Sequence, residues 1–477
     1  MAVLQRLVVP LLIAVAFFPS AKGSNQKNAP LYLTPYITGN DLEAGRKAAR
    51  VVDPCNISDV TEDCGAKIPD SYAGFLTVDE NLGNHYFFWY FPSPNKSAPL
   101  LIWLNGGPGV SSMTGLLLHN GPMRPRTADK NGANSKGKFE ERPGSWLDLF
   151  SLLYIDNPVM TGYSHSSTGP HMVPEQYGHD LYTCVTQFYQ LFPHLLSKDL
   201  YVGGMSYAGK YVSILAYKLH VARTANRTTI PLKGIYLFAP LFSPRAQFPR
   251  FSDAYYKFGI VSKKQGVDLR RKVKQLLKES REEKDAGKQR DALNNLIYTL
   301  YEIGMDLPTG LDNYVTGERV DFEAVRAIMD SNRVRSAIHA GNASFEAFNS
   351  HLIETNLPEV LFDTSKELAS LLNSGRYKVL IASGDYDILV STSMVEHALS
   401  CMRCWRGRQS YVEAKRQKWQ GLTVNGVRQL FGHYTSVNKL CRVVVHGAGH
   451  DICSDQLGIC TDMMTQFVRD GCVKSSI

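Results

Sequence analysis

Long apolar runs are scarce in this sequence of 477 residues. The run at 7–18 lies near the start of the chain and is too short to span a bilayer. No later stretch reaches the length of a transmembrane helix, so we expect the mature chain to be soluble and to have no membrane span. Internal repeats and low-complexity linkers are also lacking, which argues against a repeat protein.

Signatures of metal and nucleic-acid binding are missing too. Neither a His-Glu-x-x-His segment nor an EF-hand loop occurs, so we expect no metal and no cofactor. The formal net charge is +8, and basic residues concentrate at 263–291. Acidic residues alternate with them and no aromatic platform lies nearby. We therefore interpret 263–291 as an amphipathic helix with a solvated face and expect no nucleic-acid partner.

The first 23 residues follow the pattern of a secretory signal peptide. Arg6 precedes the apolar run, and Ala21-Lys22-Gly23 offers small residues at a cleavage site. The alternative, a short membrane anchor, is disfavoured by the length of the run. We expect cleavage near Gly23, a mature chain of 24–477, and delivery through the secretory pathway to the lysosome or the extracellular space.

Sequons and cysteines suit that route. The nine cysteines predict disulfides, with Cys55/Cys64 and Cys401/Cys404 as plausible local pairs and at least one thiol left over. Cys401-Met402-Arg403-Cys404 also resembles half a zinc site, but no second pair accompanies it, which favours a disulfide. The sequons place candidate glycosylation sites at Asn56, Asn95, Asn226 and Asn342.

Apolar strands alternate with helical segments along most of the chain. Residues 71–93 predict two strands joined by a glycine-containing turn. Further buried strands are expected at 99–104 and within 148–158, 197–220, 232–240, 377–387 and 442–451. This alternation predicts an α/β fold with a mostly parallel central sheet and helices on both faces. The charged, strand-poor region at about 245–370 predicts a helical insertion, a lid or cap, within one catalytic domain.

Ser206 stands at the most chemically suggestive turn. In Gly204-Met205-Ser206-Tyr207-Ala208, small neighbours surround a serine between a predicted strand and a predicted helix, as in a nucleophile elbow. Ala208 occupies the place of the last glycine in the Gly-x-Ser-x-Gly pattern. The alternative is an ordinary strand-to-helix turn with a capping serine.

Candidate partners for such a serine follow later strands. "SGDYD" supplies Asp385 and Asp387, and "VVVHGAGHD" supplies His446 and His450. The order Ser, Asp, His is that of α/β-hydrolases, and each candidate lies at the carboxyl end of a strand, where open α/β sheets build their sites. The residues alone leave both acids and both histidines open.

A glycine-rich loop could complete the site. "WLNGGPGVSS", 103–112, follows a strand, and the backbone N–H groups of Gly106 and Gly107 could hold an oxyanion. A plain surface turn is the alternative.

Five segments together resemble the serine carboxypeptidases, close to their vitellogenic-like branch. The segments are "WLNGGPGVSS", "DNPVMTGYS", "SYAGKYV", "SGDYDILV" and "HGAGHDICSDQ", and the likeness runs from about Leu31 to the C-terminus. It implies an α/β-hydrolase fold with a helical insertion. It also implies removal of C-terminal residues from peptides, usually at acid pH, in lysosomes, vacuoles or secretions.

The resemblance also implies roles for individual residues. Ser206 matches the nucleophile, Asp387 the orienting acid and His450 the general base. The N–H groups of Gly107 and Tyr207 match the oxyanion hole.

The substrate-binding positions depart from the family. Its members bind the terminal carboxylate of the substrate with a tryptophan, an asparagine and two glutamates, one of which carries the shared proton. Trp103 and Asn105 match, and Gly106 adjoins them, but Met205 and His119 replace the glutamates. Met205 cannot donate a proton, whereas a His119 imidazolium could attract a carboxylate directly. Further departures are Val110, Met160 and Ser213.

The sequence therefore predicts a serine-type carboxypeptidase acting on peptides or proteins with a free C-terminus. The alternatives are an esterase or acyltransferase, an endopeptidase with altered carboxylate recognition, and a non-catalytic secreted binding protein on the same scaffold. The oligomeric state is left open, a homodimer included.

Overall fold

A computed structural model describes residues 29–53, 66–126, 137–170, 172–305, 307, 312–317, 320–422 and 426–475. Its centre is a ten-stranded sheet in the order β1-β2-β6-β3-β7-β8-β9-β12-β11-β10. The strands are β1 (Tyr72–Asp79), β2 (Asn84–Phe91), β3 (Leu100–Leu104), β6 (Ser151–Ile155), β7 (Leu200–Met205), β8 (Leu232–Phe238), β9 (Lys378–Gly384), β10 (Gln417–Leu422), β11 (Arg428–Val437) and β12 (Leu440–Val445). A separate hairpin pairs β4 (Met123–Pro125) with β5 (Phe139–Glu141).

The six central strands, from β6 to β12, run parallel, and two antiparallel strands flank them at each edge. The predicted α/β fold with a mostly parallel sheet is therefore confirmed. The sequence analysis missed β10 and β11. Both are rich in polar residues and partly exposed, because β10 forms an edge of the sheet and β11 lies next to it, so neither has the continuous apolar run of a central strand.

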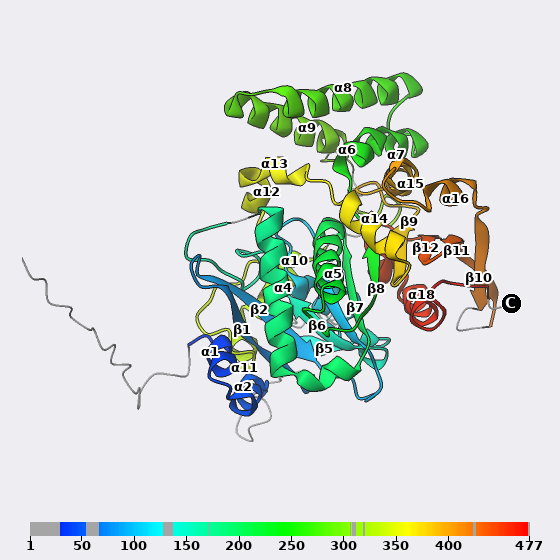
Figure 1. The fold of residues 1–477 in the computed structure, drawn as a ribbon. Helices are drawn as coiled ribbons and strands as arrows, with labels where there is room; N and C mark the ends of the chain where they lie inside the picture. Colours follow the sequence, from blue (N-terminus) through cyan, green and yellow to red (C-terminus); the bar gives the residue numbers. More distant parts are fainter. Residues whose placement is uncertain are drawn as a thin grey trace, which may run out of the picture.

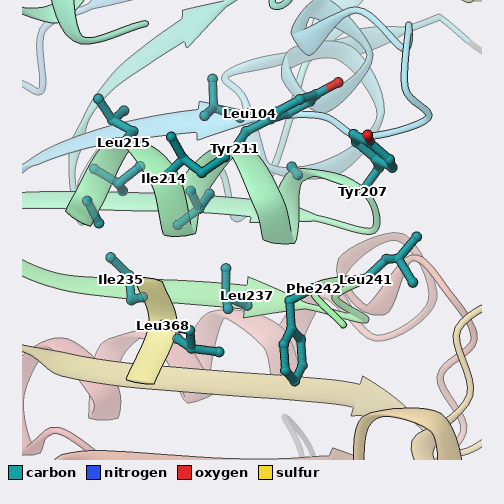
Figure 2. Close-up of a cluster of buried hydrophobic side chains, with 14 of the residues drawn as sticks. Leu104, Tyr207, Tyr211, Ile214, Leu215, Ile235, Leu237, Leu241, Phe242 and Leu368 are labelled. Carbon is teal, nitrogen blue, oxygen red and sulfur yellow. The ribbon is translucent and has the colours of Figure 1, made fainter. Parts of the chain in front are cut away.

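Two hydrophobic clusters lie on opposite faces of the sheet. Along β7, Leu200 and Val202 join one cluster, whereas Tyr201 and Met205 join the other, as the two-residue period of a strand requires. Helices α4 (Pro174–Leu191) and α5 (Ala208–Thr224) cover the first face and lie in front of the sheet in Figure 1. Figure 2 shows side chains of α5 facing those of neighbouring elements in this cluster. This packing positions the first turn of α5.

The second face is covered by helices from later in the chain. Met463, Met464 and Phe467 of α18 (Leu457–Asp470) belong to the cluster there. Elsewhere in the chain lie α1 (Thr34–Thr38), α2 (Leu42–Ala49), α3 (Ser112–Thr114), η3 (Gly115–Asn120), α15 (Thr392–Cys401), α16 (Arg408–Glu413) and α17 (Ile452–Asp455). No helix in the described ranges is both long and apolar enough to cross a membrane.

The described part of the chain between β8 and β9 is mostly helical. It contains α6 (Pro244–Gln247), α7 (Phe251–Lys257), α8 (Lys263–Glu282), α9 (Ala286–Met305), α10 (Phe322–Met329), α11 (Asn332–Ala337), α12 (His351–Thr355), α13 (Leu357–Val360) and α14 (Ser365–Ser374). The single amphipathic helix predicted at 263–291 is instead the whole of α8 and the start of α9, which lie side by side in Figure 1. The chain breaks after Glu282 because Asp285 accepts the N–H of Lys288 and begins a new helix.

Two disulfides occur in the described residues, Cys441–Cys472 and Cys453–Cys460. The predicted Cys401/Cys404 bridge is wrong, because both thiols are unpaired; Cys401 Sγ instead lies 3.5 Å from His397 Nε2. Cys55 and Cys64 lie outside the described residues. Cys441–Cys472 ties the chain after α18 back to β12, and Cys453–Cys460 joins α17 to α18, close after His450.

Candidate active site

Ser206 lies on a sharp corner between β7 and α5. Its φ is +60°, in the left-handed region that a side chain other than glycine rarely adopts. The Ser206 N–H donates to Phe238 O of β8 at 2.9 Å, and its carbonyl oxygen accepts the N–H groups of Gly209 and Leu241, also at 2.9 Å. The sheet on one side and the helix on the other thus hold the serine in a conformation that costs about 1–3 kcal/mol.

The small residues beside Ser206 are required by this corner. A Cβ on Gly204 would lie 2.5 Å from Leu104 O and 2.8 Å from the Cβ of Ala208. No side chain fits at Gly204, and Ala208 uses the space that Gly204 leaves. This is why an alanine replaces the last glycine of the elbow pattern without disturbing the turn.

His450 and Asp387 form a buried pair. His450 Nδ1 lies 2.9 Å from Asp387 Oδ2, and Asp387 Oδ1 accepts the N–H of Val390 at 2.9 Å. The side chain of His450 is 7% exposed and that of Asp387 is fully buried. Burial of the ring acts against its charged form, but the Asp387 carboxylate, with smaller contributions from Asp312 and Asp451, outweighs burial and raises the pKa of His450 to about 9.

The alternative acid and histidine, Asp385 and His446, also form a pair, but outside the cavity that contains Ser206. Asp385 Oδ2 lies 2.6 Å from His446 Nδ1, and His446 Nε2 lies 3.1 Å from Nδ1 of His433. This second pair is partly exposed, and neither member lines the cavity that contains Ser206. The structure therefore brings His450, not His446, into one cavity with the serine.

The glycine-rich loop after β3 packs against the elbow. A Cβ on Gly106 would lie 2.6 Å from Tyr207 N and 2.7 Å from Met205 O, so only glycine allows this approach. Gly107 has a φ of +100°. Within the described part of the chain, the N–H groups of Gly107 and Tyr207 donate to no other group, and both residues line the cavity. These are the properties of an oxyanion hole awaiting a negative charge.

Asp156, a residue that the sequence analysis did not single out, anchors this loop. Its carboxylate accepts Ser111 Oγ at 2.6 Å and the N–H groups of Ser112 and Tyr163 at 3.0 Å. The signal in the sequence that could have identified Asp156 was its position directly after a predicted buried strand. Asp156 thus ties the segment after the glycines to the end of β6.

A cavity of about 510 Å³ joins these groups. Ser206, Tyr207, Gly107 and His450 line it. Most of the remaining wall is apolar, and the helical region between β8 and β9 supplies a large part of it. Members of that region in the wall are Phe248, Ile297, Phe322, Ile353 and Val360.

The predicted substrate-binding residues lie at this cavity, with one exception. Asn105, Gly106, His119 and Met205 line it, whereas Trp103 lies behind and donates from Nε1 to Asn105 Oδ1 at 2.6 Å. Trp103 therefore positions Asn105 and does not line the cavity. His119 Nε2 lies 2.7 Å from Asp451 Oδ2. The sequence analysis missed Asp451 as a partner, although this residue directly follows His450.

Two other departures from the family pattern lie nearby. Val110 lines the cavity. Met160, where the family has glycine, keeps a left-handed φ of +66°, and its backbone donates to Ser164 O and accepts from Asn349 Nδ2. The glycine conformation has been retained with a side chain present, so the loop keeps its shape.

Comparison with known proteins gives the same family as the sequence motifs. A profile of the serine carboxypeptidase family matches residues 66–470. The probable serine carboxypeptidase CPVL of Homo sapiens is 31% identical over 450 residues, covering 92% of this chain and 89% of that protein. The vitellogenic carboxypeptidase of Aedes aegypti is 30% identical over 471 residues, covering 94% and 92%.

Among solved structures, the prohormone-processing carboxypeptidase Kex1 from Saccharomyces cerevisiae superposes with a TM-score of 0.72 at 20% identity. The match covers 89% of this chain and 96% of that one. It shows that the two chains share one fold, the α/β-hydrolase architecture described above.

Proposed function

This chain belongs to the serine carboxypeptidase family and is a serine-type carboxypeptidase, and from that premise we propose that Ser206 carries the reaction through an acyl-enzyme. The observation that carries the proposal is the convergence of the strained Ser206 and the Asp387-bound His450 on one cavity. The substrate is a peptide or protein with a free C-terminus.

In the acylation step, His450 Nε2 takes the proton of Ser206 Oγ as Oγ bonds to the carbonyl carbon of the last peptide bond. The carbonyl oxygen becomes an oxyanion and accepts the N–H groups of Gly107 and Tyr207. Collapse of this intermediate breaks the C–N bond. The departing amine of the C-terminal residue takes the proton from His450.

In the second step, water replaces the released residue. His450 takes one proton of the water as its oxygen attacks the ester carbon, and the same two N–H groups hold the new oxyanion. Collapse breaks the bond to Ser206 Oγ, which recovers its proton from His450. Asp387 holds Nδ1–H throughout and so keeps Nε2 available as the base.

The terminal carboxylate of the substrate lies at the end of the cavity formed by Asn105, His119 and Met205. Asn105 can donate from its side-chain amide, since Trp103 Nε1 already occupies its oxygen. Met205 contributes no charge there. His119 supplies the positive charge when its ring is protonated.

Operation at acid pH also belongs to the proposal, because a positive charge on His119 favours the free carboxylate. The raised pKa of His450 acts in the opposite direction, since it keeps the base protonated at acid pH and lowers the rate of the chemical step there. The family's usual reason, a proton shared by two glutamates, does not apply to this chain. The apolar wall suits a large apolar side chain next to the cleaved bond, and burying such a side chain contributes about 1.5–3 kcal/mol.

We further propose that the protein passes through the secretory pathway to the lysosome or the extracellular space, with glycans at the sequons. Asn95, Asn226 and Asn342 are exposed, as glycosylation requires, and Asn56 lies outside the described residues. The two disulfides support an oxidising compartment, and one relative is the venom serine carboxypeptidase of Apis mellifera, 31% identical over 454 residues. The signal peptide at 1–23 lies outside the described residues.

The test uses the purified mature protein, a fluorophosphonate probe, and a peptide offered both as the free acid and as its C-terminal amide. We expect labelling of Ser206 and faster release of the last residue from the free acid. Ser206→Ala abolishes both. A protein that ignores the probe at acid and neutral pH is a binding protein and overturns the proposal. Equal cleavage of acid and amide indicates an endopeptidase or esterase instead.

A further inference from the structure

His119 and Asp451 form a close pair behind the carboxylate-binding end of the cavity. His119 lies on η3 and is 1% exposed, and Asp451 caps the N-terminus of α17 and is 18% exposed. Asp451 Oδ2 lies 2.7 Å from His119 Nε2, off the line of a well-aligned hydrogen bond, so the contact is primarily an ion pair. The backbone N–H and the hydroxyl of Ser454 hold the carboxylate from the other side.

The pair has a direction. His119 lines the cavity of Ser206, whereas Asp451 lines an adjoining second pocket of about 160 Å³ that shares Met205 and His450 with the first. The imidazole end of the pair therefore faces the substrate cavity, and the carboxylate end does not line it. Within the described part of the chain, His119 Nδ1 has no hydrogen-bond partner.

Other titratable groups do not replace Asp451 as the partner of His119. Arg142 donates to Leu117 O beside η3 and attracts Asp451. Arg124 of β4 pairs with Glu140, and Asp455 of α17 accepts Gly449 N and Asn313 Nδ2. The remaining groups nearby are Tyr154 near Arg142, and Asp312, Asp321 and His450 around the second pocket.

We propose that Asp451 is the positioning residue of the substrate-binding site, which orients His119 and keeps its imidazolium directed at the terminal carboxylate of the substrate. This inference rests on the proposed function. It assigns to the His119–Asp451 pair the carboxylate-binding role that two glutamates have in the family. An opposite charge this close favours the charged form of the carboxylate. Burial acts to raise the pKa of the Asp451 carboxyl, but His119 and Ser454 outweigh burial and hold that pKa below its ordinary value.

The test is a double-mutant cycle with Asp451→Asn and His119→Gln, assayed on the free-acid peptide and on its amide. Asparagine is as good an N-cap as aspartate, so Asp451→Asn keeps the start of α17. The readout is the ratio of the KM values for acid and amide, in which any effect of Asp451 transmitted through His450 cancels. Asp470→Asn, a surface change in the same part of the chain, is the matched control.

We expect Asp451→Asn to raise the KM ratio by about tenfold, equivalent to about 1.4 kcal/mol of binding, with Asp470→Asn unchanged. In the His119→Gln background, Asp451→Asn should add nothing. An unchanged ratio in Asp451→Asn, or an equal effect with and without His119, overturns the inference. Failure of the wild-type protein to label or cleave would instead overturn the proposed function.

Discussion

His450 Nδ1 lies 2.9 Å from Asp387 Oδ2, and the other oxygen of Asp387 is held by the N–H of Val390. The backbone thus holds the acid at Oδ1, and its Oδ2 binds the ring. An imidazole bound in this way carries its hydrogen on Nδ1 and leaves Nε2 free to act as the base.

The first prediction follows from this geometry. Asp387→Asn keeps an oxygen for Val390 but loses the charge that sets the tautomer of His450, so kcat should fall by about 10³- to 10⁴-fold with KM little changed. Steady-state kinetics on a free-acid peptide measure this. Asp385→Asn is the matched control, since it makes the same change in the pair outside the cavity. If Asp385→Asn were the damaging variant, the exposed pair would be the catalytic one.

The pH dependence of the reaction gives the second prediction. His450 must be neutral to accept a proton, and Asp387 raises the pKa of His450 to about 9. With the amide substrate, kcat/KM should therefore rise with pH through about 9, and Asp387→Asn should move this rise to lower pH. A kcat/KM for the amide that rose at the same pH in the wild type and in Asp387→Asn would contradict this assignment of the base.

The choice between two similar pairs shows where sequence reasoning ended. Asp385 and Asp387 follow the same strand, His446 and His450 follow another, and in the structure each acid does bind a histidine. Only the family resemblance favoured Asp387 and His450, because the exposure of a pair depends on how the surrounding chain packs. The corner at Ser206 was predictable because its small residues are local.

Contacts between distant segments were beyond the sequence. Asp451 follows the predicted base directly, yet its partner His119 lies on another element, and no spacing rule connects them. The edge strand β10 and its neighbour β11 were missed for a different reason: they are largely polar, and strands at or beside an exposed edge need no buried apolar run. The central strands, buried on both faces, were all anticipated.

The third prediction concerns the loop that packs against the elbow. In Gly106→Ala, the new methyl group meets backbone atoms of Tyr207 and Met205, which cannot move aside without shifting the oxyanion N–H groups. We expect kcat to fall by about 10²-fold and the free energy of unfolding to fall by about 1–3 kcal/mol. Gly458→Ala, with no atom within 4 Å of the added carbon, is the control and should leave both unchanged or slightly raise stability. Equal behaviour of the two variants would show that the loop does not need this close approach.

The fourth prediction returns a carboxyl group to the cavity. Met205 is 6% exposed there, so a carboxyl introduced by Met205→Glu is buried, stays protonated at acid pH, and can donate to the terminal carboxylate of the substrate. The preference for the free acid over the amide should increase at acid pH.

At neutral pH, the introduced group ionises and repels the substrate, so the preference should fall below that of the wild type. Met205→Gln is the matched control, because its amide has a similar size and can donate but does not titrate. Its effect on the acid-to-amide ratio should be the same at both pH values. A Met205→Glu variant whose preference did not change with pH more steeply than that of Met205→Gln would place the terminal carboxylate away from position 205, and His119 would then bind it alone.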